Sequence, residues 1–423
     1  MLLTVPVVDG IFFPQRKTLG LDSRESTPGF QRQMVLANAE TRSFKRASIV
    51  LDRLLGLKTS ANTIERVSMN VGSDLEAAEH DGWKNVLDGE VPVPEVAIVE
   101  FDGGRIRTRK AGCGPGVHLE SKGWNETKNA IFVSATSKVS QVDPEPEPPA
   151  CFLDPGHVAK LTEKAKTKEK SGADDSLPDQ DLPSQEVPAK LKRPTHKPQR
   201  ILRTIISSMK STKEFGPQMR REATRRKFDA ASRKAFVADG LTCNWSIHAE
   251  HFGDYVPILD FTHAVSYLFM ASIACFGKSA VAWEAYVRWM RLAWVGSIGE
   301  VIAELHGHQQ RLGSPADGAS EEDPREQLRR VIGYLQKNQT RMAYAEYRKA
   351  GLPTTSAWME SAVKEMNYRI KGTEMFWNNP AGAEAILQIR AAALCDDDRL
   401  VRLLTGRPGQ STRRLRQCLT HAA

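Results

Sequence analysis

Apolar residues recur at helical spacing through residues 28–75, with a break at 56–59 where Gly-Leu-Lys-Thr interrupts the pattern. The first predicted helix, over 43–55, has four apolar residues on one face: Phe44, Ala47, Leu51 and Leu54. Ser60 is the expected N-cap of a second helix over 61–71. Its predicted buried stripe consists of Ile64, Val67 and Val71, and its outward residues include Arg66. Helix, short turn and helix is the helix-turn-helix pattern, although purely structural helix pairs share it.

The pattern changes to that of strands between residues 94 and 136. Short apolar runs bounded by Gly and polar residues predict strands at 96–101, 105–108, 116–120 and 130–135, arranged as an antiparallel meander. Two further strands are predicted at 235–238 and 255–259. A long helical region over 264–350 follows, with a polar break at 313–324. The last predicted helix, in which Glu360 lies early, has an apolar stripe of Met359, Val363, Met366 and Ile370.

The chain has 423 residues, of which 40% are hydrophobic, which is enough for a sizeable core in two or three domains. No run approaches the roughly 18 apolar residues that a membrane span needs, and the N-terminal sequence does not resemble a secretion signal. Six cysteines are scattered without a CxxC pair, which is typical of reduced thiols. We therefore expect a soluble cytoplasmic protein.

Charge is concentrated in one block. Residues 190–234 contain fifteen Lys or Arg and three acids, a net of +12, whereas the whole chain carries +8. Such a block favours a polyanionic partner, most commonly nucleic acid, although a solvated linker has the same composition. The predicted phosphate contacts within it are Arg220, Arg221, Arg225, Arg226 and Lys227.

Three carboxylates stand in distinctive settings. Asp102 in VEFDGGRIRTR and Asp239 in KAFVADGLTCNW each follow an apolar run and precede Gly, and Glu360 in TTSAWMESAVKEM lies early in the last predicted helix. An acid at the end of a strand is held by a rigid sheet and is open to solvent, as a ligand of a divalent metal must be. Together the three predict a two-metal site for cleaving phosphodiesters. Alone, each is typical of a solvated acid.

Weaker patterns surround these acids. Asp260 and His263 form a DxxH element that suits a metal ligand, an orienting group or a structural hydrogen bond. Cys243, His248 and His251 have loose zinc-like spacing but lack a fourth ligand. The segment 113–118, from Cys to His, is more typical of a turn between strands than of a ligand pair.

Three segments resemble bacterial insertion-sequence transposases of the Kra group, which are relatives of Mutator-type transposases. The segments are FDGGRIRTRKAGCGPGVH with GWNETKNA, VADG followed by ILDFTHAVSYL, and WMESAVKEMNYRIKGTEMFWNNPAGAEAILQIRA. The resemblance covers roughly residues 10–136 and 230–408. It implies a DDE triad of Asp102, Asp239 and Glu360 that binds two Mg²⁺ or Mn²⁺ ions. Asp260 and His263 match the [C/D]xxH element of Mutator relatives. Asp260 also ends a predicted strand and is the alternative second acid.

The resemblance also implies the fold and its division. We expect an α/β, RNase H-like core with a helical insertion, preceded by a helical, helix-turn-helix-like N-terminal domain. The expected boundaries are 1–85 for the DNA-binding domain, 86–139 and 230–263 for two parts of the core, 140–229 for a Pro/Lys-rich basic linker or insertion, 264–350 for the helical insertion and 351–423 for the C-terminal helical part of the core.

The function implied by the resemblance is Mg²⁺-dependent cleavage and strand transfer at the ends of an insertion sequence. The expected partners are double-stranded DNA at element ends and target and, because two ends are held together, further copies of the chain in a homo-oligomer near the bacterial nucleoid. Relatives often carry a Cys-rich segment ahead of the sequence IFFPQRKTLGLD, which begins here at residue 11. An N-terminally shortened, non-catalytic repressor that occupies element ends is therefore the alternative.

Overall fold

The chain divides into two compact units in a computed structural model that describes residues 26–87, 89–108, 124–171, 196–371, 377–378 and 380–406. The helical unit comprises Met1–Gly89 with Ala381–Ala423, and the sheet unit comprises Glu90–Pro380. This division differs from the expected one, which placed all of 351–423 in the core. The predicted strand at 116–120, the pair Cys113 and His118, and the first residues of the basic block lie outside the described residues.

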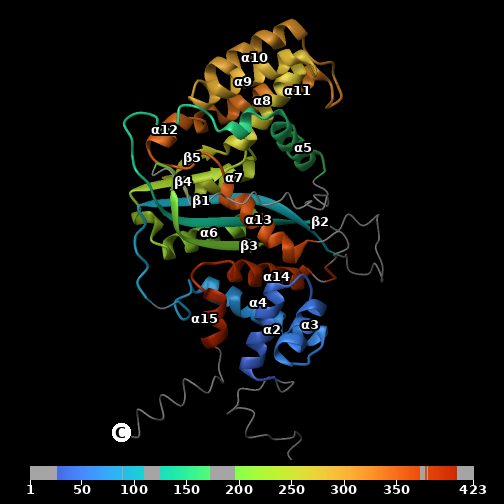
Figure 1. The fold of residues 1–423 in the computed structure, drawn as a ribbon, viewed down its shortest axis with the longest axis vertical. Helices are drawn as coiled ribbons and strands as arrows, with labels where there is room; N and C mark the ends of the chain where they lie inside the picture. Colours follow the sequence, from blue (N-terminus) through green and yellow to red (C-terminus); the bar gives the residue numbers. More distant parts are fainter. Residues whose placement is uncertain are drawn as a thin grey trace, which may run out of the picture. The chain divides into compact units, whose positions relative to one another are not determined.

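The helical unit is formed by helices from both ends of the chain (Figure 1). They are α2 (Pro28–Glu40), α3 (Phe44–Leu55), α4 (Ala61–His80), α14 (Pro380–Ala393) and α15 (Arg399–Gly406). Helices α4 and α14 approach so closely that a Cβ on Gly72 would lie 2.4 Å from Cβ of Ala385. This contact explains why residues after 380 group with the N-terminal helices.

The predicted helix pair is present as α3 and α4. Gly56 ends α3 in the left-handed conformation, with φ of 65°, and the Ser60 hydroxyl caps α4 by accepting from the Thr63 N–H. The predicted stripe of α4 is buried. On α3 only the middle of the predicted stripe is buried, at Ala47 and Leu51, while Leu54 in the last turn is 76% exposed.

The sheet unit contains a mixed five-stranded sheet in the order β3-β2-β1-β4-β5. The strands are β1 (Val96–Arg107), β2 (Trp124–Thr136), β3 (Gln199–Ser208), β4 (Arg233–Ala238) and β5 (Val256–Leu259). β2 is antiparallel to β1 and β3, whereas β4 is parallel to β1 and β5. The architecture is α/β, as expected, with β1 at the centre of the sheet.

One prediction about the strands was wrong. The runs 96–101 and 105–108 form one strand, because β2 pairs with β1 along its whole length and Gly103 and Gly104 continue the ladder instead of turning. Gly104 packs under the Thr127 hydroxyl, which would lie 2.7 Å from an added Cβ. The segment 140–229, expected to be a Pro/Lys-rich basic linker or insertion, contributes β3 and the helix α6 (Thr212–Arg225) to the sheet unit.

Helices cover both faces of the sheet (Figure 1). On one face lies α13 (Ala357–Ile370), whose Met359 N–H bonds the Glu100 carboxylate of β1. On the other face lie α6 and α7 (Thr242–His251), where Phe101 of β1 contacts Phe215 of α6 at a ring-centroid distance of 6.0 Å. Successive strand residues point to opposite faces, so Glu100 and Asp102 share the α13 face.

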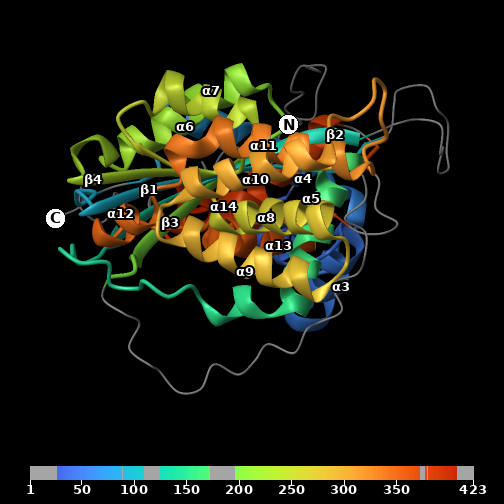
Figure 2. The ribbon, with the colours of Figure 1, turned by 90° about the horizontal axis from the view of Figure 1, so that it is seen from above.

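A block of helices follows β5 and occupies much of the predicted helical region (Figure 2). Its members are α8 (Phe261–Phe276), α9 (Ala280–Trp294), α10 (Ile298–Leu312), α11 (Pro324–Asn338) and α12 (Tyr344–Lys349). Helix α5 (Pro155–Ser171) packs against α8. Short 3₁₀ helices are η1 (Ala150–Leu153), η2 (Phe228–Ala230) and η3 (Gln339–Arg341). Among the described residues, none of the helices is long and apolar enough to cross a membrane.

Candidate active site

Three aspartates stand next to one another where the parallel part of the sheet ends. Phe101, Ala238 and Leu259 form one row across β1, β4 and β5, and each is followed directly by an aspartate: Asp102, Asp239 and Asp260. The Asp260 N–H donates to the Ala238 carbonyl at 3.0 Å, which extends the row past the end of β5. Neighbouring strands lie roughly 4.8 Å apart, so the three backbones are close.

Asp102 lies on the central strand, as predicted, and Asp239 follows the neighbouring strand. Asp102 is not at a strand end, because β1 continues to Arg107. It is half-buried and pairs in the ladder with Asn129 of β2. It lies one residue beyond Phe101 and Ala238, the last pair between β1 and β4.

Asp239 is 8% exposed and is oriented by the start of α7. Its Oδ1 accepts from Asn244 Nδ2 at 2.6 Å and from the Leu241 N–H at 3.0 Å. Gly240 then passes under the Tyr334 ring of α11, which would lie 2.1 Å from an added Cβ. Gly240 is therefore required for close packing, and the predicted turn after Asp239 leads into α7.

The DxxH element forms a hydrogen-bonded unit at the start of α8. Asp260 is 1% exposed and accepts from His263 Nδ1 at 3.1 Å, from the Thr262 N–H at 3.0 Å and from Ser356 Oγ at 2.8 Å. Burial by itself would raise the pKa of Asp260, but these donors, foremost His263, lower it below its usual value. Asp260 is thus held as a carboxylate and links β5 to the segment before α13.

Glu360 lies in the first turn of α13, as predicted. Its side chain keeps access to solvent, yet the protein atoms around it and the negative charge of Asp260 raise its pKa. The charges of His263 and Lys164 act in the opposite direction. Glu360 is thus within electrostatic reach of Asp260 and His263 of the DxxH element. Its helix, α13, packs on β1, which carries Asp102, and on the neighbouring strand β2.

Glu100 is a residue that the sequence reasoning missed. It lies in the middle of β1 with 0% exposure, and its Oε2 accepts from the Met359 N–H at 2.6 Å. Burial, followed by the charges of Asp260 and Glu360, raises its pKa well above the usual value, although the Met359 N–H opposes this shift. The available signal was one charged residue inside the apolar run Val-Ala-Ile-Val-Glu-Phe.

The carboxylates where the parallel strands stop pairing suit a hard cation, since carboxylate oxygens are the ligands that Mg²⁺ prefers. The residues that could hold it are Asp102, Asp239 and Glu360, with Asp260 as the alternative acid. Within the described ranges, however, no three His, Cys, Asp or Glu side chains are arranged as a metal-binding group. Two residues of the loose zinc pattern are engaged in hydrogen bonds within the fold instead. His248 Nε2 bonds the Tyr255 carbonyl, and Cys243 Sγ bonds the Asn244 side chain.

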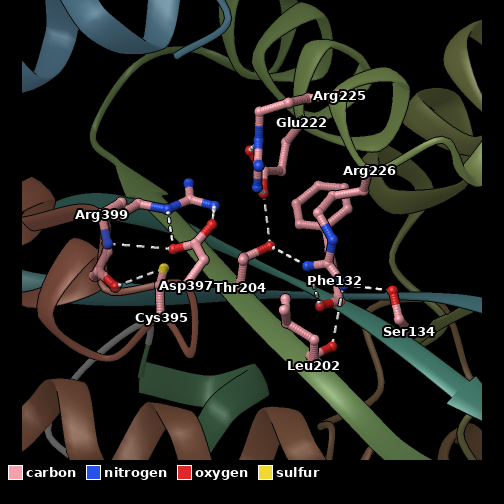
Figure 3. Close-up of polar contacts among 11 residues, drawn as sticks. Phe132, Ser134, Leu202, Thr204, Glu222, Arg225, Arg226, Cys395, Asp397 and Arg399 are labelled. Atoms are coloured by element: carbon pink, nitrogen blue, oxygen red, sulfur yellow. Dashed lines mark hydrogen bonds and ion pairs between the residues drawn. The ribbon is translucent and has the colours of Figure 1, made fainter. Parts of the chain in front are cut away.

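The structure corrects one predicted DNA contact, at Arg226. Its side chain is 1% exposed and points into the α6 face of the sheet (Figure 3). Its guanidinium donates to Thr204 Oγ1 at 2.9 Å, to the Leu202 carbonyl at 3.1 Å, to the Phe132 carbonyl at 3.5 Å and to Ser134 Oγ. A buried guanidinium bound to β2 and β3 does not reach a phosphate, so Arg226 is a core residue.

The other predicted contacts differ in accessibility. Arg225 binds the buried Glu222 through two hydrogen bonds, of 2.7 and 3.1 Å (Figure 3), and its side chain is only 12% exposed. Arg220 pairs with Asp229 at 2.8 Å and Lys227 with Glu90 at 3.2 Å, both at the surface. Arg221 and Arg66 are half-buried. Much of the basic block is therefore neutralised by acids of the chain itself.

No protein-family model matches the chain, and no curated protein matches it.

Proposed function

We propose that the chain is a DDE-type DNA transposase that performs Mg²⁺- or Mn²⁺-dependent strand cleavage and strand transfer. The supporting observation is the row of acids at the sheet edge. Asp102 and Asp239 follow paired residues of the central strand and its parallel neighbour, and Glu360 belongs to the helix packed on the Asp102 face. Three antiparallel strands followed by two parallel ones also suit an RNase H-like core.

In this proposal Asp102, Asp239 and Glu360 hold the metal ions against the scissile phosphate. Bound divalent ions would activate the attacking water or 3′-hydroxyl and stabilise the leaving oxygen. Asp239 is presented by its hydrogen bonds to Asn244 and Leu241. The pKa of Glu360 is raised. A neighbouring cation would lower it and favour the ionised form, because an opposite charge lowers the pKa of a carboxyl.

We further propose that the partner is double-stranded DNA. The helix pair α3 and α4 would contact element ends, with Arg66 as the candidate side chain. Surface ion pairs contribute little energy, so Arg220 and Lys227 can exchange their acidic partners for phosphates, and Arg221 lies beside them in sequence. Two ends held together would require more than one copy of the chain.

The test is a cleavage assay on a supercoiled plasmid that carries the gene with its flanking DNA. Wild-type protein with Mg²⁺ should nick the plasmid, and Asp102→Asn and Asp239→Asn should each lower the rate at least about 100-fold, because each removes a charge that holds the metal ions. Asp317→Asn, at an exposed residue between α10 and α11, is the matched control.

Equal activity of Asp102→Asn and wild type would contradict the assigned role. Binding to the flanking DNA without nicking in either metal would instead favour the non-catalytic repressor.

A further inference from the structure

The first turn of α13 lacks the usual cap from its own sequence. The leading N–H groups of a helix have no intrahelical acceptor, and a Ser at the N-cap commonly accepts one of them. Ser356 occupies that position, but it makes no side-chain cap. Its hydroxyl donates instead to Asp260 Oδ2 at 2.8 Å.

The missing acceptor is supplied by β1. Glu100 Oε2 accepts from the N–H of Met359, the third residue of α13, at 2.6 Å, across 259 positions of sequence. The helix is therefore capped by a side chain of the central strand.

A second connection lies beside the first. Asp260, directly after β5, holds Ser356, and the Phe261 N–H donates to the Thr354 carbonyl at 3.0 Å. The start of α13 is thus fixed at one point to β1 and at others to the end of β5, the first and last strands of the parallel set.

We propose that Glu100 and Asp260 form an anchor for the first turn of α13, and that Glu100 is a positioning residue for Glu360. Glu360 follows Met359 directly, and Asp102 lies two residues after Glu100 on the same face of β1. Strand β1 therefore carries Asp102, a proposed metal ligand, and also Glu100, which holds the helix of the second proposed ligand Glu360. The role assigned to Glu360 rests on the proposed function, whereas the anchor itself does not.

Stability alone does not account for Glu100. Its neighbours Val99 and Phe101 are apolar, and its Oε1 is buried without a hydrogen-bond partner within the described part of the chain. A buried oxygen with no partner is unfavourable, and a Leu at the centre of a sheet would avoid it. The retained carboxylate is explained by what its other oxygen holds in place.

The anchor can be measured without metal or DNA. Selective ¹⁵N-methionine labelling reports the Met359 amide among the 11 methionines, and Met359→Leu identifies its signal. In Glu100→Leu the amide loses its acceptor and should exchange with solvent about 10- to 100-fold faster. In Glu100→Gln the side-chain carbonyl can still accept, and protection should be retained. Unchanged exchange in a folded Glu100→Leu protein would overturn the anchor.

Ser356→Ala provides a second variant for the case in which Glu100→Leu does not fold. It removes only the hydroxyl that donates to Asp260 and should also speed exchange of the Met359 amide, by a smaller factor. No change in Ser356→Ala would contradict the two-point anchor.

Positioning is tested by the Mg²⁺ concentration that gives half-maximal plasmid nicking. Glu100→Leu should raise it at least about tenfold with DNA binding unchanged, and Glu100→Gln should restore it. An unaltered Mg²⁺ requirement would overturn the positioning role. If wild-type protein does not nick DNA at all, the proposed function fails, while the exchange data still decide whether the anchor exists.

Discussion

The two faces of the sheet each bury a charged side chain, and they satisfy it differently. On the α6 face, the Arg226 guanidinium donates to two hydroxyls and two carbonyls of β2 and β3 (Figure 3). On the α13 face, Glu100 uses one oxygen for the Met359 N–H and has no partner for the other among the described residues.

This difference distinguishes a face of the sheet that stabilises the fold from a face that carries the candidate active site. A buried charge with many partners strengthens the fold, because its removal leaves several acceptors unsatisfied. A buried carboxylate with few partners, beside two more acids, destabilises the fold at neutral pH and is retained where it serves a site. The α6 face is thus the structural face, and the α13 face carries the candidate chemistry.

The largest expected effect is on the structural face. Arg226→Ala should lower the free energy of unfolding by about 3–5 kcal/mol, because four acceptors in β2 and β3 lose their donor and a cavity remains. Urea unfolding followed by tryptophan fluorescence measures this. Lys213→Ala, at an exposed residue of α6, the helix that Arg226 follows, is the matched control and should change stability by less than about 0.5 kcal/mol. Similar effects of the two changes would remove the distinction between buried and surface cations of the basic block.

A smaller effect, with the opposite sign at neutral pH, is expected on the α13 face. The folded-state pKa of Glu100 is raised, so the folded protein binds more protons than the unfolded chain above the unfolded pKa of about 4.3. Stability therefore falls as pH rises from there toward the raised pKa, by up to about 1.4 kcal/mol per pH unit. Glu100→Gln cannot ionise and should escape this loss.

The measurement is the free energy of unfolding of both proteins from pH 4 to pH 8. The advantage of Glu100→Gln should grow with pH, whereas Glu346→Gln, at an exposed residue paired with Lys349, should follow wild type. Parallel curves for wild type and Glu100→Gln would mean that Glu100 is already ionised in the fold, and the contrast between the faces would disappear.

Local patterns predicted several elements of both units well. Apolar runs located β4 and β5, and helical spacing located α3, α4 and α13 with their main buried residues. The strand β3 was not predicted, because its sequence QRILRTIISS lies in a block dominated by Lys and Arg. Its two arginines suggested a solvated segment, but Arg203 is 8% exposed and pairs with Glu365 at 3.2 Å.

The sequence predicted the residues of the candidate site less completely than it predicted the helices and strands. The order of strands brings Asp102 and Asp239 to neighbouring positions, and the sequence suggested that they belong to one site through their similar settings and through the resemblance. Glu100 was missed because a single charge in an apolar run does not reveal a partner 259 residues away. Arg226 was misassigned because charge patterning does not show which cations turn inward. Such outcomes depend on tertiary packing.

In the proposed function, the segments around Asp102, Asp239 and Glu360 surround one metal site. Replacing Mg²⁺ by Fe²⁺ with ascorbate and peroxide produces hydroxyl radicals at bound iron, and these cut the nearby backbone. We expect cuts near residues 100–104, 238–241 and 356–361, all lost in Asp102→Asn and suppressed by excess Mg²⁺. Cuts elsewhere, or cuts at these segments that persist in Asp102→Asn, would contradict this proposal.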